Sequence, residues 1–472
     1  MMRMFAKLSV VAVVVFAVLQ LIRPNIPFGP MTAQIDVPSH VREILEKDCY
    51  SCHSNQRKLA WFDEIVPGYW LVRHDVLTAR EHLNFSTLGT RPLAAQRATL
   101  YEAVNMIQLG AMPLPQFTAL HTDAKVTPEE LAELKVYLAP WKNLGSTGAA
   151  PNIEAPMASA NLAAVSVEFN GLPFEPGFEK WKPISFTDRG DNNTFRAILG
   201  NDIAVKAAQA GDTSPWPDGT RFAKIAWQQA AGEDGLIRPG KFVQVEFMVK
   251  DAMLYRKTDG WGWGRWRGMD LKPYGTDSRF VAECTGCHEP VRGDDFVYTL
   301  PITAAKSARS EVANNRAAAL SQSLPYQPLS WNVITMFVDP KAQTMATLFG
   351  NDEALHAARA TETNKGLLPA HPAGSVLALV TWSQREDPHW FGGRIPDNPQ
   401  SVEFVEVDAP GNRRNYRCYD GEPGGEKSAS TTAGRGTVQP QRHCSGIRPG
   451  SEREQGKGCC AVLIVWFVES CR

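Results

Sequence analysis

The chain has 472 residues, of which 43% are hydrophobic and 21% charged, and its formal net charge is −1. This composition is typical of globular proteins, and the length allows about three domains of ~150 residues each. A net charge so close to zero offers no broadly basic surface, so nucleic acid is not an expected partner.

The N-terminus has the pattern of an export signal. Arg3 and Lys7 precede a mostly apolar run, Leu8–Ile22. A cleaved signal peptide needs small residues at its cleavage site, and none stands directly after this run. An uncleaved anchor needs about 17–20 apolar residues, slightly more than the run provides. We assign residues 1–30 to a signal or membrane anchor and favour the anchor. The protein is then periplasmic and held at the inner membrane, or secreted if the segment is cleaved.

Residues 38–142 are expected to form a small all-helical domain. The clearest signal is near its end, where Thr127 provides an N-cap, Pro128 the first helical position and Glu130 the third. This pattern predicts a helix over residues 128–139.

The pattern changes after a Gly-, Ala-, Pro- and Ser-rich linker at residues 143–164. Phe222–Trp227 and Phe242–Val249 have the composition of β-strands, and Tyr298–Leu300 is a third candidate. Residues 165–305 are therefore expected to form a β-rich domain.

An internal repeat follows this domain. The matching segments are Gly200-Asn201-Asp202 with Gly350-Asn351-Asp352, Pro217-Asp218-Gly219 with Pro372-Ala373-Gly374, and Val245-Glu246-Phe247 with Val402-Glu403-Phe404. They occur in the same order in both copies, so chance is a poor explanation. Residues 325–411 are expected to be a second, degenerate copy, and residues 412–472 a disordered tail without a function of its own.

Two Cys-x-x-Cys-His motifs carry the chemistry, one in each kind of domain: Cys49, Cys52 and His53, and Cys284, Cys287 and His288. Two thiols at this spacing can each bond a vinyl group of a porphyrin, and the adjacent imidazole then reaches the iron. A zinc site would need further Cys or His pairs nearby, and a redox dithiol would need a βαβ setting. Neither pattern is present, so we expect two covalently bound c-type haems.

Met112 is the leading candidate for the sixth ligand of the first haem iron, with His53 as the proximal ligand. It lies in a Gly-Ala-Met-Pro loop before the final helix of the domain. A thioether ligand raises the reduction potential and suits electron transfer. The alternative is that Met112 fills a gap in the core. His74 and His82 are rival ligands.

Three stretches around the first motif, Cys49–Asn55, Pro67–Asp75 and Arg80–Ser86, resemble the small haem-binding domain of bacterial exported cytochromes. The similarity covers residues 38–141. It implies a helical, cytochrome-c-like fold with the methionine of Gly-x-Met-Pro near the iron.

The surroundings of the second motif resemble the cytochrome P-460 family, which shares its fold with cytochrome c′-β. The similar segments are Pro217–Thr220, Lys224, Trp261–Trp266 and Glu283–Pro290. The resemblance implies an iron with an open sixth position and a lysine crosslinked to the porphyrin, which falls on Lys224. The alternative is an ordinary strand lysine facing solvent.

The second copy has Leu379 where the first has Lys224, and it has no Cys-x-x-Cys-His motif. We therefore expect it to be a structural or dimerisation domain without haem, and a homodimer is one consequence.

The expected architecture is α+β and multidomain: a small all-α cytochrome-c-like domain followed by two β-rich cytochrome P-460-like domains. The resemblance implies an oxidoreductase in which the second haem, crosslinked by Lys224 into a P-460-type haem, reacts with or binds hydroxylamine or nitric oxide. The first haem then relays electrons to a redox partner protein. The alternative is a non-catalytic gas-binding or electron-transfer cytochrome. Arg265 and Trp266 are candidate residues of the second haem pocket, and the alternative is a surface arginine beside a core tryptophan.

Overall fold

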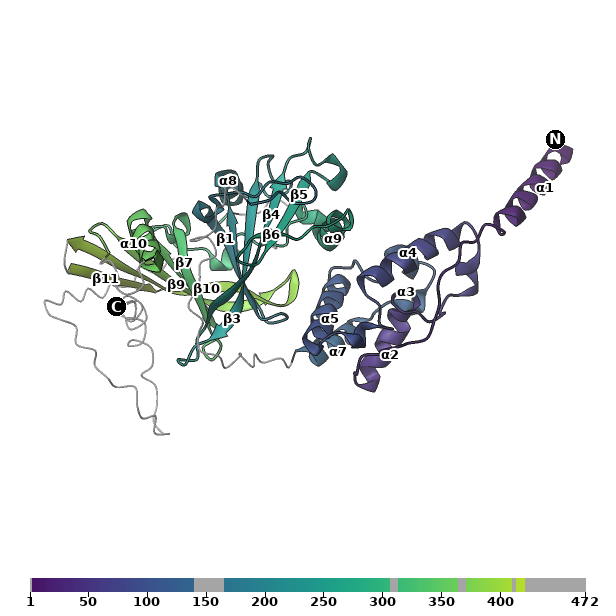
Figure 1. The fold of residues 1–472 in the computed structure, drawn as a ribbon, viewed down its shortest axis with the longest axis horizontal. Coiled ribbons are helices and arrows are strands. Elements are labelled where there is room, and N and C mark those ends of the chain that lie inside the picture. Colours follow the sequence, from purple (N-terminus) through teal and green to yellow (C-terminus); the bar gives the residue numbers. More distant parts are fainter. Residues whose placement is uncertain (1, 140–164, 306–312, 364–370, 410–412, 421–472) are drawn as a thin grey trace. The chain divides into compact units, whose positions relative to one another are not determined.

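The computed structural model describes residues 2–139, 165–305, 313–363, 371–409 and 413–420 (Figure 1). The chain divides into two compact units. One is helical and comprises residues 1–142 with 388–392, and the other comprises the remainder. The expected linker at 143–164 and most of the expected tail lie outside the described residues.

The first unit is all-helical, as expected. Its helices are α1 (Met2–Leu19), α2 (Ser39–Asp48), α3 (Tyr50–His53), α4 (Gly68–His82), α5 (Leu93–Gln108), α6 (Pro115–Thr118) and α7 (Pro128–Leu138). The start of α7 is confirmed in detail. The Thr127 side chain accepts a hydrogen bond from the Glu130 amide, and the Glu130 carboxylate accepts one from the Thr127 amide.

Helix α1 covers most of the apolar N-terminal run, and many of its large side chains, such as Leu8 and Val13, are exposed. Within the described ranges, no helix combines the length and the apolar character needed to span a membrane.

Two hydrophobic clusters form the core of the helical unit, and the first motif touches both. Cys49 packs against a cluster that includes Val41 and Tyr50, whereas Cys52 packs against one that includes Val66 and Val76. The two thiols of the motif therefore lie against different parts of the core.

The second unit is built on one antiparallel sheet. Its strands are β1 (Lys182–Arg189), β2 (Thr194–Gly200), β3 (Arg221–Ala231), β4 (Ile237–Lys250), β5 (Trp261–Arg267), β6 (Lys272–Pro273), β7 (Asn332–Asp339), β8 (Thr344–Gly350), β9 (Val376–Asp387), β10 (Trp390–Ala409) and β11 (Arg413–Asp420). The strand order is β3-β2-β1-β10-β9-β8-β7-β4-β5-β6, and β11 pairs with β10. Because β3 also pairs with β4, this path closes on itself.

The repeat seen in the sequence is a structural repeat. Helix α8 (Asp202–Ala210) follows β2, as α10 (Asp352–Thr363) follows β8. Asn201 and Asn351 cap these helices identically, each accepting a backbone hydrogen bond at 3.0 Å and donating its amide to a glycine carbonyl at 2.8 Å. Those glycines, Gly219 and Gly374, share a φ of +87°, a conformation that glycine adopts without strain.

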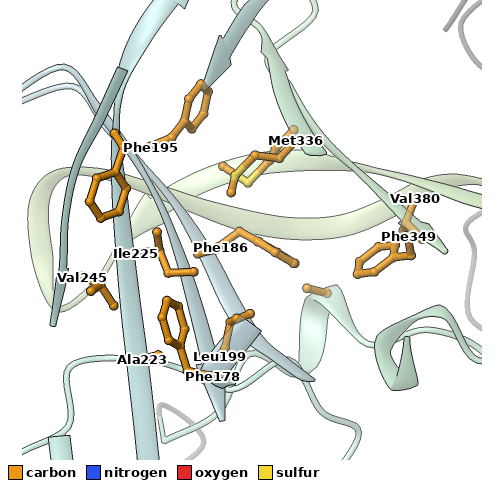
Figure 2. Close-up of a cluster of buried hydrophobic side chains, with 14 of the residues drawn as sticks. Phe178, Phe186, Phe195, Leu199, Ala223, Ile225, Val245, Met336, Phe349 and Val380 are labelled. Carbon is orange, nitrogen blue, oxygen red and sulfur yellow. The ribbon is translucent and has the colours of Figure 1, made fainter. Parts of the chain in front are cut away.

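The two copies share a single hydrophobic core (Figure 2). Phe186 on β1 is fully buried, and its ring centroid lies 6.1 Å from that of Phe349 on β8 and 6.2 Å from that of Trp382 on β9. Much of the apolar surface that each copy removes from water is therefore covered by the other copy.

Two sequence-based expectations need correction. Tyr298–Leu300 is not a strand. Its tyrosine is instead held by a side-chain contact, because Tyr298 donates its hydroxyl hydrogen bond to the Cys287 carbonyl at 2.6 Å. Residues 413–420 were expected in the tail, yet they form β11, which pairs with β10 along its length.

Candidate haem sites

The second motif lies on α9 (Arg279–His288), which follows β6. Cys284 is buried and packs with Phe280 against Trp261 and Trp263 of β5. His288 stands four residues after Cys284, so both side chains lie on one side of the helix. The motif is therefore held against the sheet by its own helix.

The His288 imidazole is oriented by a backbone carbonyl. Its Nδ1 lies 2.7 Å from the Phe296 oxygen, and its ring packs near those of Trp263 and Tyr298. A carbonyl oxygen only accepts hydrogen bonds, so we assign the proton to Nδ1. The Nε2 lone pair is then available to a metal, as in the histidine ligands of metalloproteins. Burial lowers the pKa of His288 to about 4, which keeps the ring neutral.

The first motif repeats this arrangement in a different fold. Cys49 lies between α2 and α3, as the C-cap of α2, and α3 carries Cys52 and His53. His53 Nδ1 lies 3.0 Å from the Leu83 carbonyl, so Nε2 is again the free nitrogen. Burial lowers the pKa of His53 as well.

Burial favours the protonated form of three motif thiols, those of Cys49, Cys52 and Cys284. Burial raises the pKa of Cys49 and Cys284 to about 12 and that of Cys52 to about 11. Zinc sites and redox dithiols depend on thiolates, which this burial disfavours. Buried neutral thiols beside an oriented neutral imidazole fit a thioether-linked haem better than either alternative.

One surface of the sheet faces α9. Some of its residues pack in one cluster with the buried Cys284, and the others are their neighbours on the same side of the strands. We call this surface the α9 face. It includes Ile198, Phe222, Lys224, Glu246, Met248, Trp263 and Arg265.

Lys224 lies in the middle of the α9 face. Strand pairing places it in one row with Ile198 on β2, Glu246 on β4 and Arg265 on β5. Lys224 forms an ion pair with Glu246. The same carboxylate accepts a hydrogen bond from Arg265 Nε at 2.6 Å, and Arg265 also reaches Glu283 at 3.1 Å. One carboxylate therefore serves two cations.

Burial lowers the pKa of Lys224 well below its ordinary value, and the nearby Arg196, Arg265 and Arg189 guanidinium groups lower it further. Desolvation and like charge both favour the neutral amine, whereas the ion pair with Glu246 favours the charged form. A neutral amine is the nucleophilic form of lysine.

Of the two pocket residues expected from the sequence, Arg265 lies on the α9 face and Trp266 does not. Successive strand residues point to opposite sides, so Trp261, Trp263 and Arg265 share one side of β5. Trp266 faces the shared core, where its indole N–H donates to the Ser166 carbonyl at 2.9 Å. A strict two-residue alternation along 261–267 would have predicted this division.

The candidate sixth ligands of the first site lie in separate places. His74 and His82 are exposed, although His82 is near enough to His53 to affect its pKa. Met112 is half-buried and belongs to none of the hydrophobic clusters of the described residues. Its role as a ligand stays a prediction.

His121 holds the segment after Met112 in place through contacts on both sides of its ring. His121 Nδ1 lies 3.0 Å from the Phe117 carbonyl, and its ring stacks on Phe117 at 3.8 Å. On its other side, Nε2 lies 3.0 Å from the buried Asp63 carboxylate. These contacts tie α6, which begins three residues after Met112, to the segment that precedes α4.

Both units therefore present a Cys-x-x-Cys pair beside an oriented imidazole, and this arrangement defines a haem-binding protein. Comparison with known families agrees. Residues 11–140 match a haem-binding domain, and residues 175–299 and 326–434 match Cytochrome P460. The chain therefore joins a haem-binding domain to two copies of the Cytochrome P460 domain, and it is a haem cytochrome. No curated protein matches the chain.

Proposed function

We propose that the chain is an exported cytochrome with two covalent haems. In this proposal Cys49 and Cys52 carry the first haem, and Cys284 and Cys287 carry the second. The observation that carries the proposal is that the two motif histidines are oriented in the same way. The Nδ1 atom of each contacts a backbone carbonyl. When bound, haem supplies an iron centre that exchanges electrons and binds small ligands.

The second site is proposed as the reactive one, binding or oxidising a small nitrogen species such as hydroxylamine or nitric oxide. Lys224 is proposed to crosslink to the porphyrin. Its depressed pKa supports this role, because bond formation requires an unprotonated amine. Cys287 contributes to the electrostatic environment of Lys224, so the amine belongs to the surroundings of the motif.

The first site is proposed as an electron relay to a redox partner protein. A methionine ligand at Met112 would give this haem a raised potential and a filled coordination sphere, both suited to electron transfer. Export follows from the basic and apolar N-terminal pattern, which also suggests attachment to the inner membrane.

A second candidate function is gas binding without turnover. It is favoured by the aromatic side chains around the motif on α9, which include Phe222, Trp263 and Phe296. The nearby Glu246 is held by Lys224 and Arg265, and a carboxylate engaged in this way is a poor proton acceptor.

One experiment separates these readings. The chain is expressed with cytochrome maturation machinery and digested, and the haem peptides are weighed by mass spectrometry. We expect one haem on the 49–53 peptide and one on the 284–288 peptide, the latter also joined to the Lys224 peptide. Cys52→Ala and Cys287→Ala variants identify each attachment.

Turnover is then measured by mixing the oxidised protein with hydroxylamine and following haem reduction. Reduction of both haems supports the enzyme, with the first haem as acceptor. Binding of nitric oxide without hydroxylamine oxidation supports the gas-binding alternative. A first motif without haem would rule out the relay.

A further inference from the structure

Arg196 on β2 has no ion-pair partner in the described part of the chain, although the negative charge of Asp191 is near enough to act on its pKa. It pairs with Ala226 on β3, two residues beyond the pairing of Ile198 with Lys224, so it lies on the α9 face one row further along. Its Nε is buried without a hydrogen-bond partner, and the described residues offer its guanidinium no ion pair.

The neighbouring cations are already paired. Arg189 binds Asp191 through two nitrogens, with Nε at 2.6 Å from one carboxylate oxygen. Arg265 binds Glu246 and Glu283. The acidic groups around Arg196 are thus engaged elsewhere.

Burial, together with the positive charge of Arg189, lowers the pKa of Arg196 to about 9. An unpaired guanidinium in such a place is costly, and an anion would remove most of that cost. The site therefore has the chemistry of a receptor for a carboxylate or a similar anion, which guanidinium binds through two parallel hydrogen bonds.

The α9 face changes from apolar to cationic along the strands. At the end packed against Cys284 it carries Phe222, Met248 and Trp263. Four residues further along β3, roughly 13 Å at strand rise, is the row of Arg196. A porphyrin has the matching polarity, because its macrocycle is apolar and its two propionate carboxylates extend from one edge.

The second copy provides an internal comparison. Strand pairing places Asp339 where the first copy has Arg189, and Cys418 where it has Arg265. The copies differ likewise at Arg196 and Lys224, whose counterparts are Ala346 and Leu379, whereas Glu246 is matched by Glu403.

All four cations are therefore missing from the copy that lacks a haem motif, although the acidic position is kept. A purely structural role for the arginines would predict no such difference between two copies of one fold.

We infer that Arg196, assisted by Arg189, binds a propionate carboxylate of the haem attached to Cys284 and Cys287. This inference rests on the proposed haem at that motif. It makes Arg196 a positioning residue that sets the rotation of the porphyrin on the sheet, while Cys284 fixes the opposite edge.

The test compares Arg196→Gln and Arg196→Lys with the control Arg267→Gln. Arg267 lies in the same row of the α9 face but stacks on Tyr274 and bonds to Gln244. The readouts are the haem-peptide mass, the pH dependence of the midpoint potential, and the propionate bending modes in the resonance Raman spectrum.

Arg196→Gln should keep the haem by mass and raise the propionate pKa by about one to three, the range that loss of a close opposite charge produces. This appears as a new pH-dependent segment of the potential and as shifted Raman modes. Arg196→Lys should restore part of the wild-type behaviour, and Arg267→Gln should resemble the wild type. If Arg196→Gln does not fold, the propionate Raman modes of the wild type are titrated with pH instead. A propionate pKa below the ordinary carboxyl range supports the inference, and an ordinary pKa contradicts it.

The outcomes separate the two proposals. A wild type without haem on the 284–288 peptide overturns both. Haem that is present with propionate modes unchanged in Arg196→Gln overturns the inference alone. A Soret shift induced by inorganic sulfate in the wild type and lost in Arg196→Gln, with unchanged propionate modes, would assign the site to a free anion instead.

Discussion

Lys224 and Leu379 occupy equivalent positions in the two copies of the sheet. Lys224 pairs with Ile198 on β2, and Leu379 pairs with Leu348 on β8. In the second copy this row belongs to an apolar cluster that also contains Leu377. One backbone frame therefore supports a charged surface beside α9 and an apolar surface in the copy without the motif.

Replacing Lys224 should abolish the proposed crosslink while leaving the thioether bonds intact. Lys224→Ala removes the amine without touching Cys284 or Cys287, so mass spectrometry should find the haem on the 284–288 peptide alone. The absorption spectrum should become that of an ordinary c-type haem. Lys206→Ala, an exposed lysine on α8, is the control and should keep the wild-type spectrum. An unchanged crosslink in Lys224→Ala would assign it to another residue.

Met112→Ala should lower the potential of the first haem. Loss of a thioether ligand exposes the iron to water or another ligand, and axial ligands set haem potentials over a range of ~0.8 V, so a fall on the order of 100 mV is expected. Redox titration measures it. Met31→Ala is the matched control, because the Met31 sulfur already accepts a hydrogen bond from Ser86. Equal potentials in the two variants would count against Met112 as the ligand.

Glu403 should make the stability of the β-rich unit depend on pH. Its buried carboxyl accepts a hydrogen bond from the Tyr416 hydroxyl at 2.9 Å, yet burial raises its pKa from 4.5 to about 7. The folded protein therefore holds a proton that the unfolded chain releases above pH 4.5. This contribution is full below pH 4.5 and is lost as the pH rises to about 7.

Glu403→Gln removes the titrating group but retains an acceptor for Tyr416. At pH 8 the variant should exceed the wild type in free energy of unfolding by up to about 3 kcal/mol, and the difference should shrink towards pH 5. Urea unfolding at several pH values measures both. A constant difference across this range would show that Glu403 does not titrate there.

Phe186→Ala should destabilise both copies together. The ring is fully buried between Phe349 and Trp382, and truncation of such a phenylalanine costs about 3–5 kcal/mol. Because the copies share one core, we expect a single unfolding transition at a lower temperature. Calorimetry that resolves two transitions, only one of them shifted, would contradict a shared core.

Local patterns predicted much of this structure. The capping box at Thr127 and Glu130 predicted α7 to within one residue, because helix ends depend on neighbouring side chains. The strands predicted at 222–227 and 242–249 lie within β3 and β4. The repeat also predicted that Asn201 and Asn351 occupy equivalent positions.

Long-range pairing supplied the rest. Arg196 stands in a seven-residue strand without a distinctive pattern, and its surroundings come from residues on β1, β3, β5 and α9. No local signal connects these segments, since their proximity depends on strand register. Tyr298 was misassigned for the opposite reason. Its local composition is that of a strand, but its contacts with Cys287 and His288 hold it elsewhere.

The core shared by the two copies has a consequence for assembly. A β-rich domain that buried this surface against a second chain would depend on protein concentration for its stability. Here the covering surface belongs to the same polypeptide, so the burial of this surface does not require a second chain. The copy without a haem motif thereby covers the apolar core of the copy that carries the motif. A chain truncated before residue 325 would lack Phe349 and Trp382, and the side chain of Phe186 would become exposed to solvent.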